Sequence, residues 1–367
     1  MSKQVIFSRN EKRLQSEAIR SNNTQEKRLK RAELAAYQSR IGRFDLARIE
    51  IDNLRKENSE IPCLKVSIAI HIAEGLYNYF SDVGVTSADS MERAYALSVA
   101  GGELQFQALS ASWLAQWEYS RFNFPALWRY VTESLRLADP KNSSALSRAY
   151  LVGAQALHLA DRADLARNWY KKSHEIASRV QDDATVSAIM HNTSWLQMLC
   201  LRQEVLAGIS DKSGGRQALL NAQSTANFDL LHGDTSWNQL KPLLQAQISS
   251  LIDKPDDALK IYIDNFSEIH SAGRLRSYLS ADVAWCFLRQ NINKEALLWA
   301  DISEMSLPEV SQSDDRAATH SVLSIVYNNI SMFEKSKIHS ESAKKLWNEH
   351  IGIQASIVDL WGVHNSI

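Results

Sequence analysis

Residues 161–166 of the chain read Asp-Arg-Ala-Asp-Leu-Ala, and residues 42–47 read Gly-Arg-Phe-Asp-Leu-Ala. In both stretches a loop residue is followed, five positions later, by an alanine near the start of an apolar helix. Weaker copies run over 253–258, 291–296 and 331–336, the last with serine in place of alanine. A small side chain is needed where two antiparallel helices cross at closest approach, because a large one pushes them apart. A pattern repeated in this way predicts a solenoid of helical hairpins.

The composition agrees with an all-helical fold. The 367 residues include only 13 Gly and 6 Pro, whereas a β-sandwich or barrel needs a turn signal about every 8–12 residues. Apolar residues make up 45% and charged residues 23%, close to the averages of soluble globular proteins. We therefore predict an all-α solenoid of antiparallel helix pairs, with about eight hairpins and a C-terminal helix that caps the last apolar face.

The small residues expected at the helix crossings recur at a favoured spacing. Four of the seven intervals between them are 38 or 40 residues. These anchor residues are Ala47, Ala94, Ala126, Ala166, Ala218, Ala258, Ala296 and Ser336. The spacing predicts a basic N-terminal segment over 1–24, helical or partly disordered, a repeat array over 25–348 and a capping helix over 349–367. An irregular stretch at 208–215 is interpreted as a surface insertion, or alternatively as a hinge or partner contact.

One pair of predicted helices carries a recognisable repeat signature. The residues that carry it are Tyr150, Gly153, Ala154 and Leu157, followed by Ala163, Ala166 and Tyr170. The pattern resembles the tetratricopeptide repeat (TPR), whose helices place aromatic and small residues at such positions. The spacing near 40 is similar to the longer-helix arrays of bacterial regulatory proteins, including the sensor arm of MalT-like transcription activators. The resemblance implies a right-handed superhelix whose first helices line a concave groove that binds a protein or peptide partner.

The resemblance also assigns residues to that groove. Transferred onto this chain, the groove positions are Gln155, His158, Gln247, Ser250, Trp285, Arg289, Ile325 and Asn328. Amides at such positions satisfy the backbone of a bound peptide, and Trp285 offers a surface for an apolar anchor. Only Arg289, with Arg148 at the edge, supplies charge, so the expected lining has modest polarity. Alternatively, some of these positions are buried inside a tightly wound superhelix.

Charge is distributed unevenly along the chain. The net charge is −1, yet residues 1–43 hold eleven Lys or Arg against four Glu. The basic residues expected to form an N-terminal patch are Lys12, Arg13, Lys27, Arg28, Lys30 and Arg31. Such a segment is typical of an arm that meets an acidic partner or a phosphate backbone. A solvated helix face is the simpler explanation, and docking on acidic repeats of the same chain is another.

Motifs for a reaction or a metal site are missing from the sequence. The ten histidines form no HExxH pattern, the glycine pairs form no phosphate-binding loop, and no dinucleotide fingerprint is present. Cys63, Cys200 and Cys286 form no CxxC pair, which argues against both a disulfide framework and a zinc site. No apolar run approaches the ~18 residues of a membrane span, and the N-terminus lacks a signal-peptide core. We expect a cytoplasmic, non-catalytic protein without metal or cofactor.

These observations lead to three functional expectations. The first is a protein–protein interaction scaffold or regulatory adaptor that holds a protein or peptide partner in the groove. The second is a sensor that responds to a peptide or small ligand and regulates a separate transcriptional or signalling effector. The third and weakest is nucleic-acid binding through the basic N-terminus. A homo-oligomer and a subunit of a larger complex are both compatible with the sequence, and a membrane partner is not expected.

Overall fold

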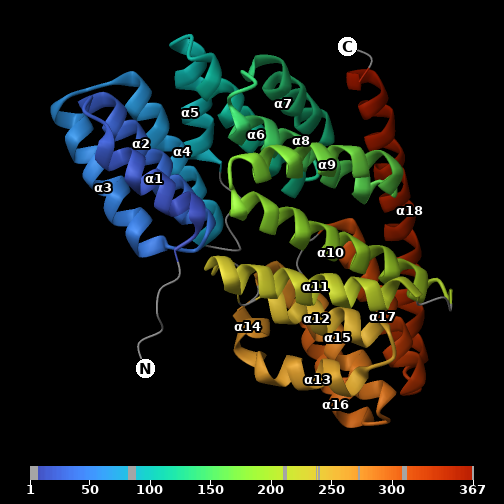
Figure 1. Cartoon of the computed structure of the whole chain (residues 1–367). Helices are drawn as coiled ribbons and strands as arrows, with labels where there is room; N and C mark the ends of the chain where they lie inside the picture. Colours follow the sequence, from blue (N-terminus) through green and yellow to red (C-terminus); the bar gives the residue numbers. More distant parts are fainter. Residues whose placement is uncertain are drawn as a thin grey trace, which may run out of the picture. The chain divides into compact units, whose positions relative to one another are not determined.

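The computed structural model describes residues 7–81, 88–209, 213–236, 238, 240–271, 273–307 and 312–365. Within these ranges the regular elements are helices and no strand is present (Figure 1). The all-α prediction is therefore confirmed for the described part of the chain. The chain divides into two compact units. Unit 1 comprises 1–190, 227–237 and 357–367, and unit 2 comprises 191–226 and 238–356.

Unit 1 is built from consecutive helix pairs. Its helices are α1 (Arg9–Arg20), α2 (Thr24–Arg40), α3 (Phe44–Glu60), α4 (Leu64–Ser81), α5 (Asp89–Ala100), α6 (Leu104–Ser120), α7 (Phe124–Leu137), α8 (Ser143–Leu159), α9 (Ala163–Arg179) and the start of α10 (Asp183–Leu206). The first helix of each pair packs on its own partner and on the first helix of a neighbouring pair, as α2 does on α3 and α4 and α6 does on α7 and α8 (Figure 1). This arrangement is consistent with a helical repeat.

Unit 2 contains the rest of α10, most of α11 (Ser213–His232), α12 (Lys241–Leu251), α13 (Pro255–Asp264), α14 (Phe266–Ser271), the short 3-10 helix Gly273–Leu275, α15 (Arg276–Arg289), α16 (Asn293–Met305), α17 (Ser313–Asn329) and most of α18 (Phe333–Asn365). In this unit α15 packs on α13, α16 and α17. The segment expected as a separate capping helix, 349–367, instead lies largely within the unbroken α18. Part of the irregular stretch, residues 210–212, lies outside the described residues.

The recurring six-residue pattern has a clear structural basis. Its five loop residues have left-handed backbones, with φ values of 77° at Gly42, 56° at Asp161, 62° at Asp253, 61° at Asn291 and 64° at Ser331. The residue that follows each one donates a backbone hydrogen bond into the preceding helix; Arg162, for example, donates to the Leu157 carbonyl at 2.9 Å. This is the Schellman ending, which stops one helix and lets the next begin at once. The small residue therefore arrives five positions after the turn.

The anchor residues lie where the pattern places them, with one exception. All but Ala126 are buried. In that pair Phe122 has the left-handed backbone, at φ 57°, so the fifth position is Leu127, which is completely buried. In that pair the turn geometry, rather than the residue type, thus sets the register.

Glycine at position 331 should make the protein more stable than alanine at the same position. Ser331 is exposed, and its left-handed backbone disfavours any residue that carries a Cβ atom. We expect S331G to raise the free energy of unfolding by about 0.5–1 kcal/mol relative to S331A. Urea denaturation of the two variants checks this, and a glycine variant no more stable than the alanine variant would contradict it.

Candidate functional site

Most of the predicted groove residues are buried inside the helix pairs. Gln155, His158, Gln247, Ser250 and Trp285 are all less than 9% exposed. Arg289 and Ile325 are half-buried and Asn328 is exposed. The five buried side chains fit the alternative that these positions pack between helices. Gln155 and His158 lie in unit 1 and the others lie in unit 2.

The contacts of these residues are internal ones. Gln247 Nε2 donates to Asp282 Oδ2 at 3.3 Å, within the core of unit 2. The Arg289 guanidinium donates to the Ser250 carbonyl oxygen at 2.8 Å, pairs with Asp253 and lies over the Trp285 ring. In the structure as it stands, these side chains join helices of unit 2.

Half of the predicted basic patch is neutralised by ion pairs within unit 1. Four of its six residues have partners there: Arg13 binds Glu17 and Asn10, Arg28 binds Ile61 and Asn58, Lys30 binds Glu17 and Glu33, and Arg31 binds Glu50 and Glu57. Lys12 and Lys27 are exposed. The pairs involve neighbouring helices, so the basic residues hold α1, α2 and α3 together rather than forming one open cationic surface.

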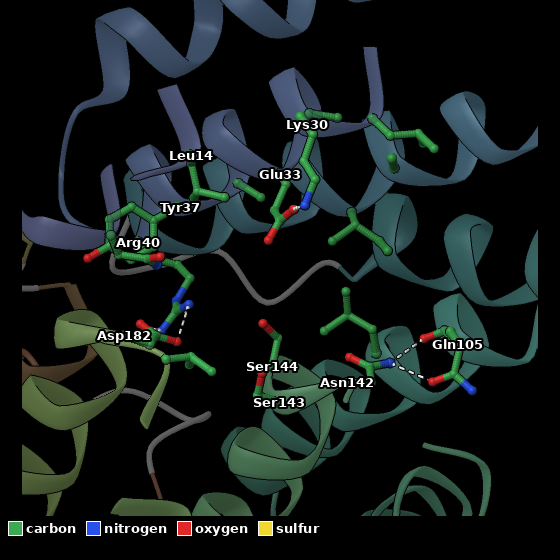
Figure 2. Close-up of a pocket in the computed structure, with 18 of the residues that line it drawn as sticks. Leu14, Lys30, Glu33, Tyr37, Arg40, Gln105, Asn142, Ser143, Ser144 and Asp182 are labelled. Carbon is green, nitrogen blue, oxygen red and sulfur yellow. Dashed lines mark hydrogen bonds and ion pairs between the residues drawn. The ribbon is translucent and has the colours of Figure 1, made fainter. Parts of the chain in front are cut away.

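An open cavity of about 860 Å³ lies within unit 1, lined by α1, α2, α4, α6, the start of α8, the end of α9 and the turn before α10 (Figure 2). Sites for small molecules and cofactors typically measure about 300–1,000 Å³. None of the predicted groove residues lines it, whereas Arg13 and Lys30 of the predicted basic patch do. The cavity is therefore a candidate binding site that the repeat pattern did not locate.

Apolar side chains from four helices form the floor and one wall of the cavity. They are Leu14 of α1, Leu29, Ala32 and Ala36 of α2, Ala69, Ile72 and Leu76 of α4, and Phe106, Leu109 and Trp113 of α6. These positions recur at helical spacing because each helix turns one apolar stripe toward its neighbours. A ligand with an apolar body would remove this surface from water.

Polar groups gather where α8 begins. The Asn142 side chain caps α8 by accepting from the Ala145 backbone N–H at 3.4 Å, and it donates to the Gln105 side-chain oxygen at 3.1 Å. Figure 2 shows the hydroxyl of Ser144 pointing into the cavity, with Lys30 and Glu33 of α2 on the opposite wall. The first turn of a helix presents backbone N–H groups and a positive dipole end. This end of the cavity therefore favours negative charge.

A buried ion pair closes another side of the cavity. Arg40 donates to both Asp182 oxygens at 3.0 and 3.1 Å and to the Thr185 hydroxyl at 2.7 Å. The Thr185 backbone N–H and hydroxyl also donate to Asp182. Burial alone would raise the pKa of the Asp182 carboxyl, but Arg40 and Thr185 outweigh burial and lower it. The pair links the end of α2 to the start of α10 and gives the cavity a fixed wall.

Unit 2 contains a separate group of titratable side chains. The Nδ1 atoms of His320 and His339 are 2.8 Å apart, and His339 Nε2 lies 3.4 Å from the Glu304 carboxylate. Tyr327 and Lys335 also bind Glu304, at 2.9 and 2.7 Å. Neither this cluster nor any other group of three or more His, Cys, Asp or Glu side chains in the described part of the chain is arranged so that it could hold a metal ion. We interpret this cluster as a structural element of the α16–α18 packing.

Two further findings bear on function. Among the described residues, no helix combines the length and the apolar character needed to cross a bilayer. In comparisons with known proteins, no protein-family model matches the chain and no curated protein is significantly similar to it. Functional assignment therefore depends on the geometry of the cavity.

Proposed function

We propose that the chain is a non-catalytic regulatory protein of the TPR-like, right-handed solenoid type, and that it binds its effector ligand in the cavity of unit 1. The observation that carries the proposal is the cavity itself: about 860 Å³ with an apolar floor and a polar end. The volume suits a small molecule or a few residues of a peptide.

The position of the cavity suggests how binding would be sensed. Its walls come from α1, α2, α4, α6 and α8, which belong to successive helix pairs. A ligand that contacts several pairs favours one angle between them over others, because it binds that arrangement more tightly. A change of pitch in the repeat then alters the surface offered to an effector protein. This mechanism requires no reaction chemistry.

Filling the cavity provides the test of the proposal. Ala36 lies on the floor and is half-buried, so Ala36→Trp places a large ring within it. The probe is phenylnaphthylamine, a neutral dye that fluoresces when it leaves water. We expect the wild type to bind it at one saturable site and A36W to bind it at least about tenfold more weakly, since the apolar contact area is lost.

The control is Ala163→Trp, which adds the same ring at an exposed position on α9. A163W should bind the dye as the wild type does. Equal binding by A36W and the wild type would contradict the cavity as the ligand site. A thermal-shift screen of metabolites and short peptides on the wild type and A36W then identifies the natural ligand class.

A peptide adaptor is the second candidate function. It is favoured because the cavity is lined by the first helices of successive pairs, as a peptide-binding groove would be. The same screen separates the two candidates. Stabilisation by peptides alone, lost in A36W, favours the adaptor, whereas stabilisation by one metabolite favours the sensor.

A further inference from the structure

Arg148 is a buried cation without a counter-ion. It lies on α8, one turn after Ser144, and only 5% of the residue is exposed. Its Nε is enclosed and has no hydrogen-bond partner, and no ion pair holds its guanidinium among the described residues. The Nε atoms of Arg28, Arg40 and Arg202 are enclosed in the same way, but Arg40 and Arg202 are each paired with an aspartate and Arg28 donates to Asn58 and to the Ile61 carbonyl. An unpaired buried charge is strongly disfavoured, so this exception needs an explanation.

The charged groups around Arg148 do not cancel its positive charge. Asp182 is the nearby anion, but Arg40 and Thr185 occupy both of its oxygens. Burial and the neighbouring Arg40 lower the pKa of Arg148 to about 9, which still leaves the guanidinium charged at neutral pH. Two buried arginines thus lie near a single carboxylate, which binds only Arg40. The Trp113 ring, whose centroid is 3.9 Å from the Arg148 guanidinium carbon, offsets part of this charge through a cation–π contact.

Arg148 lies directly behind the wall of the cavity. Trp113, Arg40 and Asp182, which interact with it, and Ser144, one turn away on α8, all line the cavity. Lys141 and Arg179 also line the cavity, are exposed, and form no ion pair within the described residues. The first turn of α8 adds its positive dipole end. Glu33 stands on the opposite wall, where Lys30 binds it at 3.1 Å.

We infer that the ligand of this cavity is a small organic anion. Its acid group lies at the start of α8, on the cavity side of the wall that covers Arg148, where it offsets the Arg148 charge without touching the guanidinium. Its apolar body lies on the floor formed by α4 and α6. The inference rests on the proposed function and names the ligand class of that site. One negative charge on the ligand offsets the unpaired charge of Arg148. Glu33 on the opposite wall disfavours a ligand bound with its acid group at that side.

Two dyes with the same ring system test the inference. Anilinonaphthalene sulfonate carries an acid group, and phenylnaphthylamine lacks it. We expect the wild type to bind the sulfonate more tightly than the neutral dye. In Arg148→Gln the sulfonate should bind about tenfold more weakly, because the buried guanidinium attracts the acid group through space rather than by a hydrogen bond, while the neutral dye should bind unchanged. Arg129→Gln, at an exposed position on α7, is the control.

The outcomes separate this inference from the proposed function. If R148Q binds both dyes as the wild type does, the anion site is wrong although the cavity function stands. If neither dye binds the wild type, the proposed function fails and the inference fails with it. Octanoate, octyl phosphate and octanol as competitors then distinguish the acid groups. Displacement by octanoate or octyl phosphate identifies a carboxylate or a phosphate ligand, whereas equal displacement by octanol overturns the inference.

Stability gives an independent readout. If the Arg148 guanidinium served only to stabilise the fold, removing it should lower the stability of the protein. If it is retained to bind a ligand, its unpaired buried charge should instead destabilise the ligand-free protein. We expect the unfolding temperature of ligand-free R148Q to equal or exceed that of the wild type. A clear drop in that temperature would show that Arg148 is structural and would overturn the inference.

Discussion

Replacing Asp282 with alanine should lower the free energy of unfolding of unit 2 by about 3–5 kcal/mol, because it leaves a buried arginine without its counter-ion. Asp282 is completely buried and accepts from Arg202 at 2.6 and 2.7 Å. Gln247 and Tyr262 donate to the same carboxylate at 3.3 and 3.4 Å. Burial disfavours the Arg202 charge, but Asp282 raises the pKa of Arg202 above its ordinary value. Without the carboxylate, only the burial penalty remains.

Urea denaturation of the full chain, followed by tryptophan fluorescence, measures this loss. Arg202→Met alone should also destabilise unit 2, since it leaves the Asp282 charge unpaired. The double variant Arg202→Met/Asp282→Leu should recover most of the stability, because apolar residues of similar volume can replace a buried ion pair. A D282A variant within about 1 kcal/mol of the wild type, the range of an exposed ion pair, would show that the pair is solvated.

The contrast with Arg148 makes this result informative. Arg202 and Arg148 are both buried arginines that lie against an aromatic ring, at 4.2 Å from Tyr278 and 3.9 Å from Trp113. Only Arg202 has its own carboxylate. If D282A is strongly destabilised and R148Q is not, the difference lies in the counter-ion, as expected if the charge of Arg148 serves an anionic ligand in the cavity rather than the fold.

The helix pairs could be predicted because their chemistry is local. A residue tolerant of a left-handed backbone, such as Gly42 or Asn291, marks the turn, and the buried small residue follows five positions later. Even the misplaced anchor follows this rule, since Phe122 takes the left-handed backbone and moves the register from Ala126 to Leu127. Because these signals depend only on residues close together in sequence, the helix pairs can be predicted without knowledge of the tertiary structure.

The candidate site could not be predicted because its residues are brought together by the stacking of pairs. Arg40 and Asp182 are 142 positions apart, and no spacing rule connects them. The groove positions were assigned as if every first helix had one open face, but Gln155 and Gln247 are enclosed by neighbouring pairs. The angle between successive pairs decides which face closes. Arg148 gave a partial signal, as a charge at the edge of the expected groove.

Unit 2 should lose stability as the pH falls from about 7 to about 5, because three of its histidines are held neutral by the fold. Burial, then the neighbouring His339 and Arg316, lower the pKa of His320 to about 4. Burial also lowers the pKa of His339 and of His350, although Glu304 and Asp314 respectively oppose it. In the unfolded chain these groups titrate near 6.5.

The direction of this pH dependence follows from the number of protons that the folded and unfolded chains bind. Between the folded and unfolded pKa values the unfolded chain binds more protons, so stability rises with pH across that window and is lost as the pH falls through it. For His320 alone the difference corresponds to about 3 kcal/mol at most, and its contact with water reduces that to about 1–2 kcal/mol. Burial raises the pKa of the Glu304 carboxyl, but Lys335 and Tyr327 lower it by more, so the pKa lies below its ordinary value. Glu304 therefore loses its contribution to stability only at lower pH. The range from 5 to 7 therefore reports mainly the histidines.

Urea midpoints of His320→Gln, measured from pH 5 to pH 7, test this explanation. The variant removes the imidazole that faces His339 at 2.8 Å and keeps a polar side chain of similar length. The charged groups that remain around the position are Arg316 of α17, Asp301 and Glu304 of α16, and Lys335 of α18. Because those charges are common to both proteins, any flattening of the pH dependence belongs to His320. The exposed His174 of unit 1 provides the control, since His174→Gln should leave the slope unchanged, and an H320Q slope equal to that of the wild type would exclude His320 as its source.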